Sequence, residues 1–321
     1  MFLSIGELLI DFFSESSSKD DLKYSANLGG APANVAVRTA SLNVKSFLYS
    51  KVGNDFFGDY LIEKIRSFKV NSEYIFRSNS KTTLAVVSLS ETKERSFSFY
   101  RNRTADTMMS KKDIEKIDYT KFKVAHFGSL GLVSKNSRDA HYALLKKLKK
   151  NKAIITFDPN LRSDLYKNIK DFRETIFEAF DFVEILKISE EEIKYLFPKI
   201  PYNDAIKIIL RKIPHIFITK GNKGSEYYSK SLYVSANTIS VDVVDTTGAG
   251  DAFMSGLIYS LFKNDFKLEN GSAIKNILNF SNILGALAVT KKGAVSCMPT
   301  FEDITNIMRL NKWIMIWEKK L

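Results

Sequence analysis

Short apolar runs rich in β-branched residues alternate with segments of helical periodicity along most of the chain. This alternation is typical of an α/β protein in which helices cover a mostly parallel sheet. The predicted strands are Met1–Ile5, Phe47–Val52, Val124–Phe127, Ile154–Asp158, Phe182–Lys187 and Ile216–Lys220. The predicted helices are Ala33–Leu42, Asp55–Phe68, Ser137–Lys149, Asp171–Phe180, Glu190–Leu196, Tyr202–Ile213, Ala249–Phe262 and Ala273–Lys291. Several strands end in Gly, Asp or Asn, and open α/β sheets bind their ligands at such strand ends.

One region departs from this alternation. Residues 81–103 read TTLAVVSL and then ERSFSFYR around the polar stretch Ser90–Lys93, which predicts a β-hairpin. A second extended stretch, at about 9–28, precedes the first glycine pair. Together the two stretches predict a small antiparallel sheet that stands off the main domain as a lid, with an ordinary edge hairpin as the alternative.

The sequence shows no internal repeat and no low-complexity linker. We therefore interpret residues 1–321 as a single α/β domain whose lid strands come from about 9–28 and 81–103. Near the C-terminus, Trp313, Ile314 and Trp317 recur at helical spacing. This spacing predicts a helix that packs against the domain and not a membrane anchor.

The composition is that of an ordinary soluble globular protein, with 45% hydrophobic and 26% charged residues. Because Cys297 is the only cysteine, a disulfide within the chain and a cysteine-based zinc site are excluded. The three histidines are scattered and form no HExxH motif. A catalytic zinc or iron ion held by the protein alone is therefore not expected.

The formal net charge of +12 raises the question of a nucleic-acid partner. The basic residues are mostly spread along the chain, and the densest run, Lys146–Lys152, falls at the end of a predicted helix, where cations suit the dipole. We therefore predict no nucleic-acid partner.

The first residues, MFLSIGELLIDFF, lack the basic segment and cleavage site of a signal peptide, and no stretch approaches the roughly 18 uncharged apolar residues of a membrane span. These features predict a cytoplasmic protein that does not enter a membrane.

The segment VVDTTGAGDAFMSG, residues 243–256, carries the strongest chemical signal in the chain. A Gly-Ala-Gly turn precedes an amphipathic helix there, and the unpaired backbone N–H groups at a helix start form an anion site. Gly248 and Gly250 lack a Cβ atom, so the backbone can approach a phosphate closely. Asp251 follows in the first helical turn, where a carboxylate can accept the proton of an attacking hydroxyl. The alternative is a glycine turn with a capping aspartate, but the complete string is more specific than a lone Gly-x-Gly.

A second glycine motif, NLGGAPAN at Asn27–Asn34, runs into the helical pattern VAVRTASL. Its glycine pair allows an unusual backbone turn, and Pro32 suits the opening position of a helix. Asn34 offers donors and an acceptor that match a sugar hydroxyl, and Asp11 could accept from two vicinal hydroxyls. Each residue alone is more often a turn or cap residue, but the pairing with the first motif favours a sugar site.

Gly29–Asn34 and Asp245–Asp251 resemble the two signatures of the PfkB/ribokinase family of carbohydrate kinases, and they stand in that family's order. The similarity covers nearly the whole chain. Five further strings are most similar to the fructokinase branch of the family: GELLIDF near the N-terminus, FYR at 99–101, HFGSL at 126–130, DPNLR at 158–162 and LKISEEE at 186–192.

The resemblance implies a ribokinase-like α/β fold, with a mostly parallel central sheet, helices on both faces and a small β lid over the sugar. It implies that Asp251 is the catalytic base and that the amides around Gly248, Ala249 and Gly250 form the anion hole for the transferring phosphate. It also implies ATP and Mg²⁺ as cofactors, with Glu190 positioning the magnesium ion largely through water. Lid strands pair between subunits in this family, so a homodimer is left open against a monomer.

The resemblance assigns sugar binding to Asp11, Gly30 and Asn34, and it implies that Arg101 and Arg162 contact the substrate or a phosphate. Those that it assigns to nucleotide binding are Lys187, Thr219, Gly221, Gly224 and Asn282. Asp245 and Thr247 resemble part of a loop that binds a monovalent cation such as K⁺ in several members. Many members carry an asparagine where this chain has Lys187, although lysine is frequent there in fructokinase-like sequences.

The sequence thus predicts a sugar kinase that transfers the γ-phosphate of ATP to a hydroxymethyl group, with fructose as the substrate and fructose 6-phosphate as the product. A kinase for 2-keto-3-deoxygluconate or for a riboside is the alternative within the family, because Tyr100, Arg101 and Arg103 would suit an acidic sugar. A third interpretation is a non-catalytic member that acts as an interaction module. The predicted base and both turn glycines are present, which disfavours that interpretation.

Overall fold

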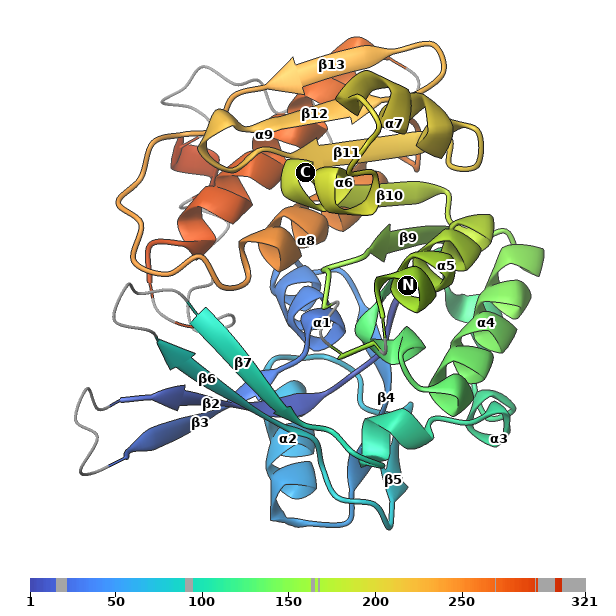
Figure 1. Cartoon of the computed structure of the whole chain (residues 1–321), viewed down its shortest axis with the longest axis vertical. Coiled ribbons are helices and arrows are strands. Elements are labelled where there is room, and N and C mark those ends of the chain that lie inside the picture. The colour runs from blue at the N-terminus through green and yellow to red at the C-terminus, as the bar shows by residue number, and fades with distance from the viewer. Residues whose placement is uncertain are drawn as a thin grey trace.

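The computed structural model describes residues 1–15, 22–89, 95–162, 165–166, 168–268, 270–291, 293 and 304–307. Within these ranges the chain forms a nine-stranded sheet flanked by helices, and a separate four-stranded sheet stands off it (Figure 1). The predicted α/β architecture is therefore confirmed. The interpretation of residues 1–321 as a single domain stays a prediction.

The large sheet is mostly parallel. Its strands, among the described residues, are β1 (Phe2–Ile5), β4 (Ser46–Gly53), β5 (Ile75–Ser78), β8 (Val124–Gly128), β9 (Ile154–Asp158), β10 (Ile185–Ser189), β11 (His215–Thr219), β12 (Ser225–Tyr228) and β13 (Tyr233–Ala236). They lie in the order β13-β12-β11-β10-β9-β8-β1-β4-β5. Neighbouring strands from β11 to β5 are parallel, whereas β12 and β13 add antiparallel pairs at one edge. This topology agrees with the prediction from the sequence.

Helices cover both faces of this sheet, as predicted (Figure 1). One face carries α1 (Ala31–Ser41), α2 (Phe56–Ser67), α8 (Ala249–Lys263) and α9 (Gly271–Ala288). The other face carries α3 (Lys111–Ile114), α4 (Lys135–Lys150), α5 (Ile169–Ala179), α6 (Glu190–Leu196) and α7 (Tyr202–Leu210). Short 3₁₀ turns connect several elements: η1 (Ala105–Met108), η2 (Tyr119–Lys121), η3 (Leu130–Leu132), η5 (Phe180–Phe182) and η6 (Gly221–Lys223).

The four-stranded sheet combines the two extended stretches that the sequence predicts as a lid. Its strands are β2 (Leu9–Ser14), β3 (Tyr24–Gly29), β6 (Leu84–Leu89) and β7 (Arg95–Tyr100), in the order β3-β2-β6-β7. The pairs β2–β3 and β6–β7 are antiparallel, but β2 and β6 run parallel. The small sheet is confirmed, and the prediction of purely antiparallel pairing is wrong at its centre. The predicted turn at Ser90–Lys93 lies outside the described residues.

The strands of the large sheet send alternate side chains into cores on opposite faces. In β1, Leu3 and Ile5 belong to the core shared with α4 and α5, whereas Phe2 belongs to the core shared with α8 and α9. Phe127 of β8 and Phe157 of β9 are fully buried, and their rings stack with centroids 4.4 Å apart. This packing fixes the carboxyl ends of β8 and β9, where polar side chains gather.

Several predicted element boundaries are wrong by a few residues. The strand predicted at Phe182–Lys187 is β10, which begins later because the N–H of Val183 donates to the carbonyl of Phe180 in a 3₁₀ turn. The helix predicted at Ala273–Lys291 is α9, which begins earlier because the Asn270 side chain caps its start.

The sequence does not predict β5, β12 or β13. Each has four residues, lies at or next to an edge of the sheet and is partly exposed. Such short edge strands carry a weak periodicity signal. The segment with Trp313 and Trp317 lies outside the described residues. Among the helices that the structure describes, none combines the length and apolarity of a membrane span.

Phe157→Ala should lower the free energy of unfolding by about 3–5 kcal/mol, because it removes a fully buried ring and leaves a cavity. Equilibrium unfolding in urea would show this loss as a lower midpoint with little change in slope. Phe56→Ala is the matched control, since Phe56 is 77% exposed and its loss should change stability by less than about 0.5 kcal/mol. Equal effects of the two substitutions would contradict this description of the core.

Candidate active site

A cavity of about 1100 Å³ lies between the carboxyl ends of the parallel strands and the lid. Polar side chains reach it from several elements: Glu7 after β1, Asp11 in β2, Asp158 at the end of β9 and Lys187 in β10. The start of α8, Gly248–Asp251, also lines it. Open α/β sheets bind ligands at this edge, so the position of the cavity is the one that the fold favours.

Most of the predicted site residues come together in this cavity, although they are far apart in the sequence. Those that line it are Asp11, Gly30, Asn34, Arg162, Lys187, Thr219, Gly221, Gly224, Thr247, Gly248, Ala249, Gly250, Asp251 and Asn282. Arg101, Glu190 and Asp245 lie outside its lining.

The first turn of α8 allows a ligand to approach the backbone closely. Gly248 is its N-cap, and the φ of 78° lies in the left-handed region that favours glycine. A Cβ atom at Gly250 would lie 2.8 Å from Lys187 Nζ, so a larger residue there would displace that amine. The amides of a first helical turn have no partner within the helix, and they lie at the positive end of its dipole. The turn is therefore suited to hold an anion, as the sequence predicts.

Asp251 connects α8 to α1 at the cavity wall. Asn34 Nδ2 donates a hydrogen bond to Asp251 Oδ2 at 2.8 Å, and both residues are buried. Burial raises the pKa of Asp251 to about 6; the Asn34 hydrogen bond opposes this shift and the negative charge of Asp158 adds to it. At neutral pH Asp251 is therefore an ionised carboxylate that is more basic than an ordinary aspartate. These are the properties of a general base.

A buried ion pair lies beside this turn. Lys187 Nζ is 2.8 Å from Asp158 Oδ2, and only 7% and 6% of the two side chains are exposed. Burial alone would lower the pKa of Lys187, but the charges of Asp158 and Glu192 outweigh it and raise that pKa. The amine therefore stays positively charged. Asp158 Oδ1 is buried without a hydrogen-bond partner, so it can still accept from a ligand or a water.

The acidic start of α6 holds neighbouring loops in place. Glu192 accepts hydrogen bonds from the N–H groups of Ser189 at 2.8 Å and Leu161 at 3.0 Å. Glu190, the residue predicted to position magnesium, lies outside the cavity lining and pairs with Lys194 at 3.6 Å. A contact from Glu190 to a ligand through water stays a prediction.

Close contacts with neighbouring atoms leave room only for glycine at Gly29 and Gly30, the glycine pair of the second motif. A Cβ atom at Gly29 would lie 2.3 Å from Asp11 Oδ2, and one at Gly30 would lie 2.4 Å from the Glu7 carbonyl oxygen. Gly30 also has a φ of 104°, so that position favours glycine on two grounds. The bare backbone brings Asp11, Gly30 and Asn34 to one cavity. Asn34 Oδ1 is buried there without a hydrogen-bond partner.

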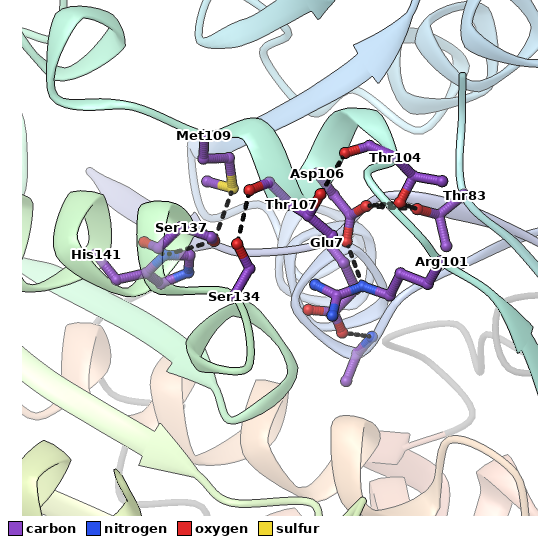
Figure 2. A network of polar contacts seen from close by, with 11 residues as sticks. Glu7, Thr83, Arg101, Thr104, Asp106, Thr107, Met109, Ser134, Ser137 and His141 are labelled. Carbon is purple, nitrogen blue, oxygen red and sulfur yellow. Dashed lines mark hydrogen bonds and ion pairs between the residues drawn. The ribbon is translucent and has the colours of Figure 1, made fainter. Parts of the chain in front are cut away.

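Arg101 lies behind the cavity wall and does not line the cavity. Its Nε donates to Asp106 Oδ2 at 2.7 Å, and only 6% of its side chain is exposed. Asp106 also accepts from Thr104 Oγ1 at 2.9 Å and from the Thr83 hydroxyl (Figure 2). A contact from Arg101 to the substrate or a phosphate stays a prediction, since in the structure its guanidinium group pairs with the buried Asp106 carboxylate.

The predicted nucleotide-binding residues come from β10, β11, the turn after β11 and α9. A Cβ atom at Gly224 would lie 2.0 Å from the Ala236 carbonyl oxygen, and the φ of Gly224 is 89°, so this turn requires glycine. A Cβ atom at Gly221 would meet nothing within 4 Å. Asn282 Nδ2 donates to the carbonyls of Ala236 at 3.2 Å and Asn237 at 3.3 Å. These bonds hold the end of β13 against α9 at the cavity wall.

Asp245 and Thr247, the residues predicted to bind a monovalent cation, belong to the loop before α8. Asp245 Oδ1 accepts from the Thr247 N–H at 2.8 Å, and its Oδ2 accepts from the Gly293 N–H at 2.9 Å. Thr247 lines the cavity, whereas Asp245 fixes the loop behind it. A cation bound to this loop stays a prediction.

The cavity also contains residues that the sequence-based assignment left out, among them Glu7, Ser129, Asp158, Asn160 and Glu192. A signal existed for Asp158 and Asn160, because polar residues that end a predicted strand collect at the ligand edge of the sheet. Glu192 is the last of three consecutive glutamates, and the sequence did not indicate which of the three line the cavity. Glu7 carried the same signal, because Gly6 and Glu7 follow the first predicted strand, but only the fold brings it against the second glycine motif.

An anion-binding turn with an adjacent base, on a mostly parallel sheet with a small lid, is an arrangement suited to phosphoryl transfer onto an alcohol. The chain belongs to the pfkB family of carbohydrate kinases, whose model matches residues 1–301. It is therefore a sugar kinase with a ribokinase-like fold. Probable fructokinase-5 of Arabidopsis thaliana is 35% identical over 315 residues, which cover 96% of this chain and 97% of that relative.

Solved fructokinases have closely similar folds. The fructokinase of Xylella fastidiosa with bound ATP has a TM-score of 0.91 and 27% identity, with 97% of this chain and 98% of that chain covered. A double mutant of the Vibrio cholerae O395 fructokinase, with fructose, ADP and a potassium ion bound, has a TM-score of 0.85 and 29% identity. That comparison covers 95% of this chain and 97% of the other.

Gly250→Ala should lower kcat/KM for ATP by at least about tenfold, because the added methyl group would meet Lys187 Nζ at 2.8 Å and disturb the turn. A coupled assay of ADP release measures the loss. Gly271→Ala is the matched control: Gly271 also opens a helix, but a Cβ atom there would make ordinary contacts at 3.9 Å. Full activity of the Gly250 variant would show that the turn does not hold the nucleotide phosphates.

Proposed function

We propose that this kinase transfers the γ-phosphate of ATP to the hydroxymethyl group of fructose and releases fructose 6-phosphate and ADP. The proposal rests on the position of Asp251, a buried carboxylate in the first turn of α8 that is hydrogen-bonded to Asn34 of the second glycine motif. A base, an anion-binding turn and a sugar-binding motif would thus meet at one point. Fructose as the sugar is supported by the similarity to fructokinases.

In the proposed reaction the sugar hydroxyl attacks the γ-phosphorus while Asp251 accepts its proton. The new O–P bond forms as the bond from the γ-phosphorus to the bridging oxygen breaks, and ADP leaves with that electron pair. The amides around Gly248–Gly250 would stabilise the charge on the transferring group. The Lys187 ammonium group lies beside the same turn, where Asp158 holds it at 2.8 Å. Its positive charge would attract the phosphates.

ATP would lie along Thr219, Gly221, Gly224 and Asn282, which line the cavity together with the turn of α8. The open space at Gly221 leaves room for a ligand against the backbone. The fructokinase of Xylella fastidiosa was solved with bound ATP, which supports this choice of phosphate donor.

Mg²⁺ suits the phosphate side of the cavity because Asp158 Oδ1 is a buried carboxylate oxygen without a partner. Magnesium prefers oxygen ligands and retains several waters, so Asp158 and Glu190 would hold it largely through its water shell. When bound, the ion would neutralise negative charge on the phosphates. We also propose that the loop of Asp245 and Thr247 binds K⁺, with support from the potassium ion in the Vibrio cholerae fructokinase.

The acceptors that lie near the second glycine motif favour a neutral sugar. Glu7 Oε2 and Asn34 Oδ1 are buried acceptors without a partner, and Asp11 adds a further carboxylate to the lining. Sugar hydroxyls can donate to such atoms, whereas the carboxylate of an acidic sugar can only accept. Arg101, which would suit an acidic sugar, is paired with Asp106.

One observation favours a 2-keto-3-deoxygluconate kinase instead. Arg162 lines the cavity, and its guanidinium group could pair with the carboxylate of that sugar. The riboside alternative rests on the family resemblance alone. A homodimer through the lid, a cytoplasmic location and the expected lack of nucleic-acid and membrane partners stay predictions from the sequence.

Asp251→Asn should lower kcat with fructose and ATP by about 10²–10⁴-fold, because the amide cannot accept the hydroxyl proton. In the wild-type enzyme, kcat/KM for fructose should fall as the pH drops through about 6, since Asp251 becomes protonated there. Coupled ADP assays across the acid and neutral range measure both effects. Near-wild-type turnover by a folded Asp251 variant, with folding checked by circular dichroism, would refute the role of Asp251 as the base.

In a panel of sugars, kcat/KM for fructose should exceed that for 2-keto-3-deoxygluconate by at least about tenfold, because buried acceptors disfavour its carboxylate. It should also exceed kcat/KM for ribosides, since the chain is similar to fructokinases. The same coupled assay gives the values, and phosphorus NMR identifies the product as the 6-phosphate. A requirement for a carboxylated sugar would contradict the assignment of a neutral substrate and would favour the alternative that Arg162 suggests.

A further inference from the structure

Glu7 lines the cavity but takes no part in the proposed phosphoryl transfer. It follows β1 and is only 3% exposed. Its Oε1 accepts a hydrogen bond from the N–H of Ala31 at 3.1 Å, whereas its Oε2 is buried without a hydrogen-bond partner. A buried carboxylate oxygen without a partner costs free energy, so a ligand or a water usually satisfies such an atom.

We propose that Glu7 is a further sugar-binding residue and that its Oε2 accepts a hydrogen bond from a sugar hydroxyl other than the one that is phosphorylated. This inference rests on the proposed function, because it requires a hydroxyl-bearing substrate beside Asp11, Gly30 and Asn34. All three residues line the same cavity as Glu7. A Cβ atom at Gly30 would lie 3.3 Å from Glu7 Cγ, so the Glu7 side chain lies directly against the sugar-binding glycine.

The buried ion pair of Arg101 and Asp106 lies near the Glu7 carboxylate, and Figure 2 shows the three side chains. Burial raises the pKa of Glu7 to about 7; backbone hydrogen bonds from Glu7 itself and from Ala31 and the positive charge of Arg101 oppose this shift, and the negative charge of Asp106 adds to it. Asp106 holds Arg101 at 2.7 Å and is itself bonded to Thr83 and Thr104. Around neutral pH an ionised fraction of Glu7 is therefore available to accept from a hydroxyl.

A purely structural role for Glu7 is the alternative that the experiment must separate. Glu7 Oε1 accepts from the first residue of α1, so the side chain already stabilises the start of that helix. Arg101 Nη2 is a buried donor without a partner, and its approach to Glu7 Oε2 would satisfy both atoms. In that case Glu7 would act through Arg101 and would not contact the sugar.

Glu7→Gln tests the role of Oε2 separately from that of Oε1. The amide oxygen can still accept from Ala31, whereas the NH₂ group replaces Oε2. We expect KM for fructose to rise about tenfold, with kcat within about threefold of wild type and KM for ATP unchanged, since a hydrogen bond to a charged group is lost. Glu7→Ala should raise KM for fructose similarly and should also lower the melting temperature, because it removes the acceptor for Ala31. Steady-state kinetics and thermal unfolding measure these changes.

Glu184→Gln is the matched control for a carboxylate-to-amide change. Glu184 also accepts a backbone N–H, from Ile155 at 2.9 Å, but it lies outside the cavity lining, so KM for fructose should not change. An unchanged KM in the Glu7→Gln variant would overturn the proposal. A double-mutant cycle with Arg101→Met tests the alternative. Additive effects on KM support a direct sugar contact, whereas loss of the Glu7→Gln effect in the Arg101→Met background would refute it.

The pH dependence of kcat/KM for fructose gives a readout that a structural role would not change. The wild-type value should fall as the pH drops through about 7, where Glu7 becomes protonated, and again through about 6, where Asp251 does. Glu7→Gln should keep only the lower ionisation, and an unchanged profile would contradict the proposal. If the wild-type enzyme does not phosphorylate fructose, the proposed function fails before any variant is compared. The same comparison with the sugar that the panel identifies then tests Glu7.

Discussion

The hydrogen bond between Asn34 and Asp251 is the contact on which the whole site depends. It joins the first turns of α1 and α8, which pack side by side on one face of the sheet (Figure 1). Each of these helices begins at a glycine with positive φ, so the bond fixes two specialised turns relative to one another. The partners are 217 residues apart in the sequence, and therefore only the completed fold can bring them together.

Burial then determines the charges at this junction. Asp251 loses contact with water, which raises its pKa to about 6, yet it remains ionised at neutral pH. Lys187 is equally shielded, but the neighbouring Asp158 raises its pKa and keeps it positive. A basic carboxylate and a fixed cation, both with buried side chains, thus line one cavity. Electrostatic interactions are stronger in such surroundings than in water, which favours a preorganised site for a charged transition state.

The sequence predicted the parts of the site whose local conformation requires particular residues. Gly30 and Gly248 have positive φ angles that favour glycine, so their strings were recognisable, and Asn34 and Asp251 follow them closely. The pairing of Arg101 with Asp106 could not be predicted, because the position of Asp106 depends on how the lid packs against the main sheet. The sheet was predictable where apolar runs are long, whereas β12 and β13 are short and partly exposed. These features depend on long-range packing, which local sequence patterns do not predict.

The central claim is that Asp251, a buried aspartate in the first turn of α8, accepts the proton from the sugar while the adjacent backbone binds the phosphate. A crystal structure with fructose and a non-hydrolysable ATP analogue tests it most directly. The account predicts the hydroxyl at C6 within about 2.6–3.2 Å of an Asp251 carboxylate oxygen, with the γ-phosphate against the amides of Gly248–Asp251. A sugar bound with that hydroxyl out of reach of Asp251, or a triphosphate bound away from this turn, would contradict it.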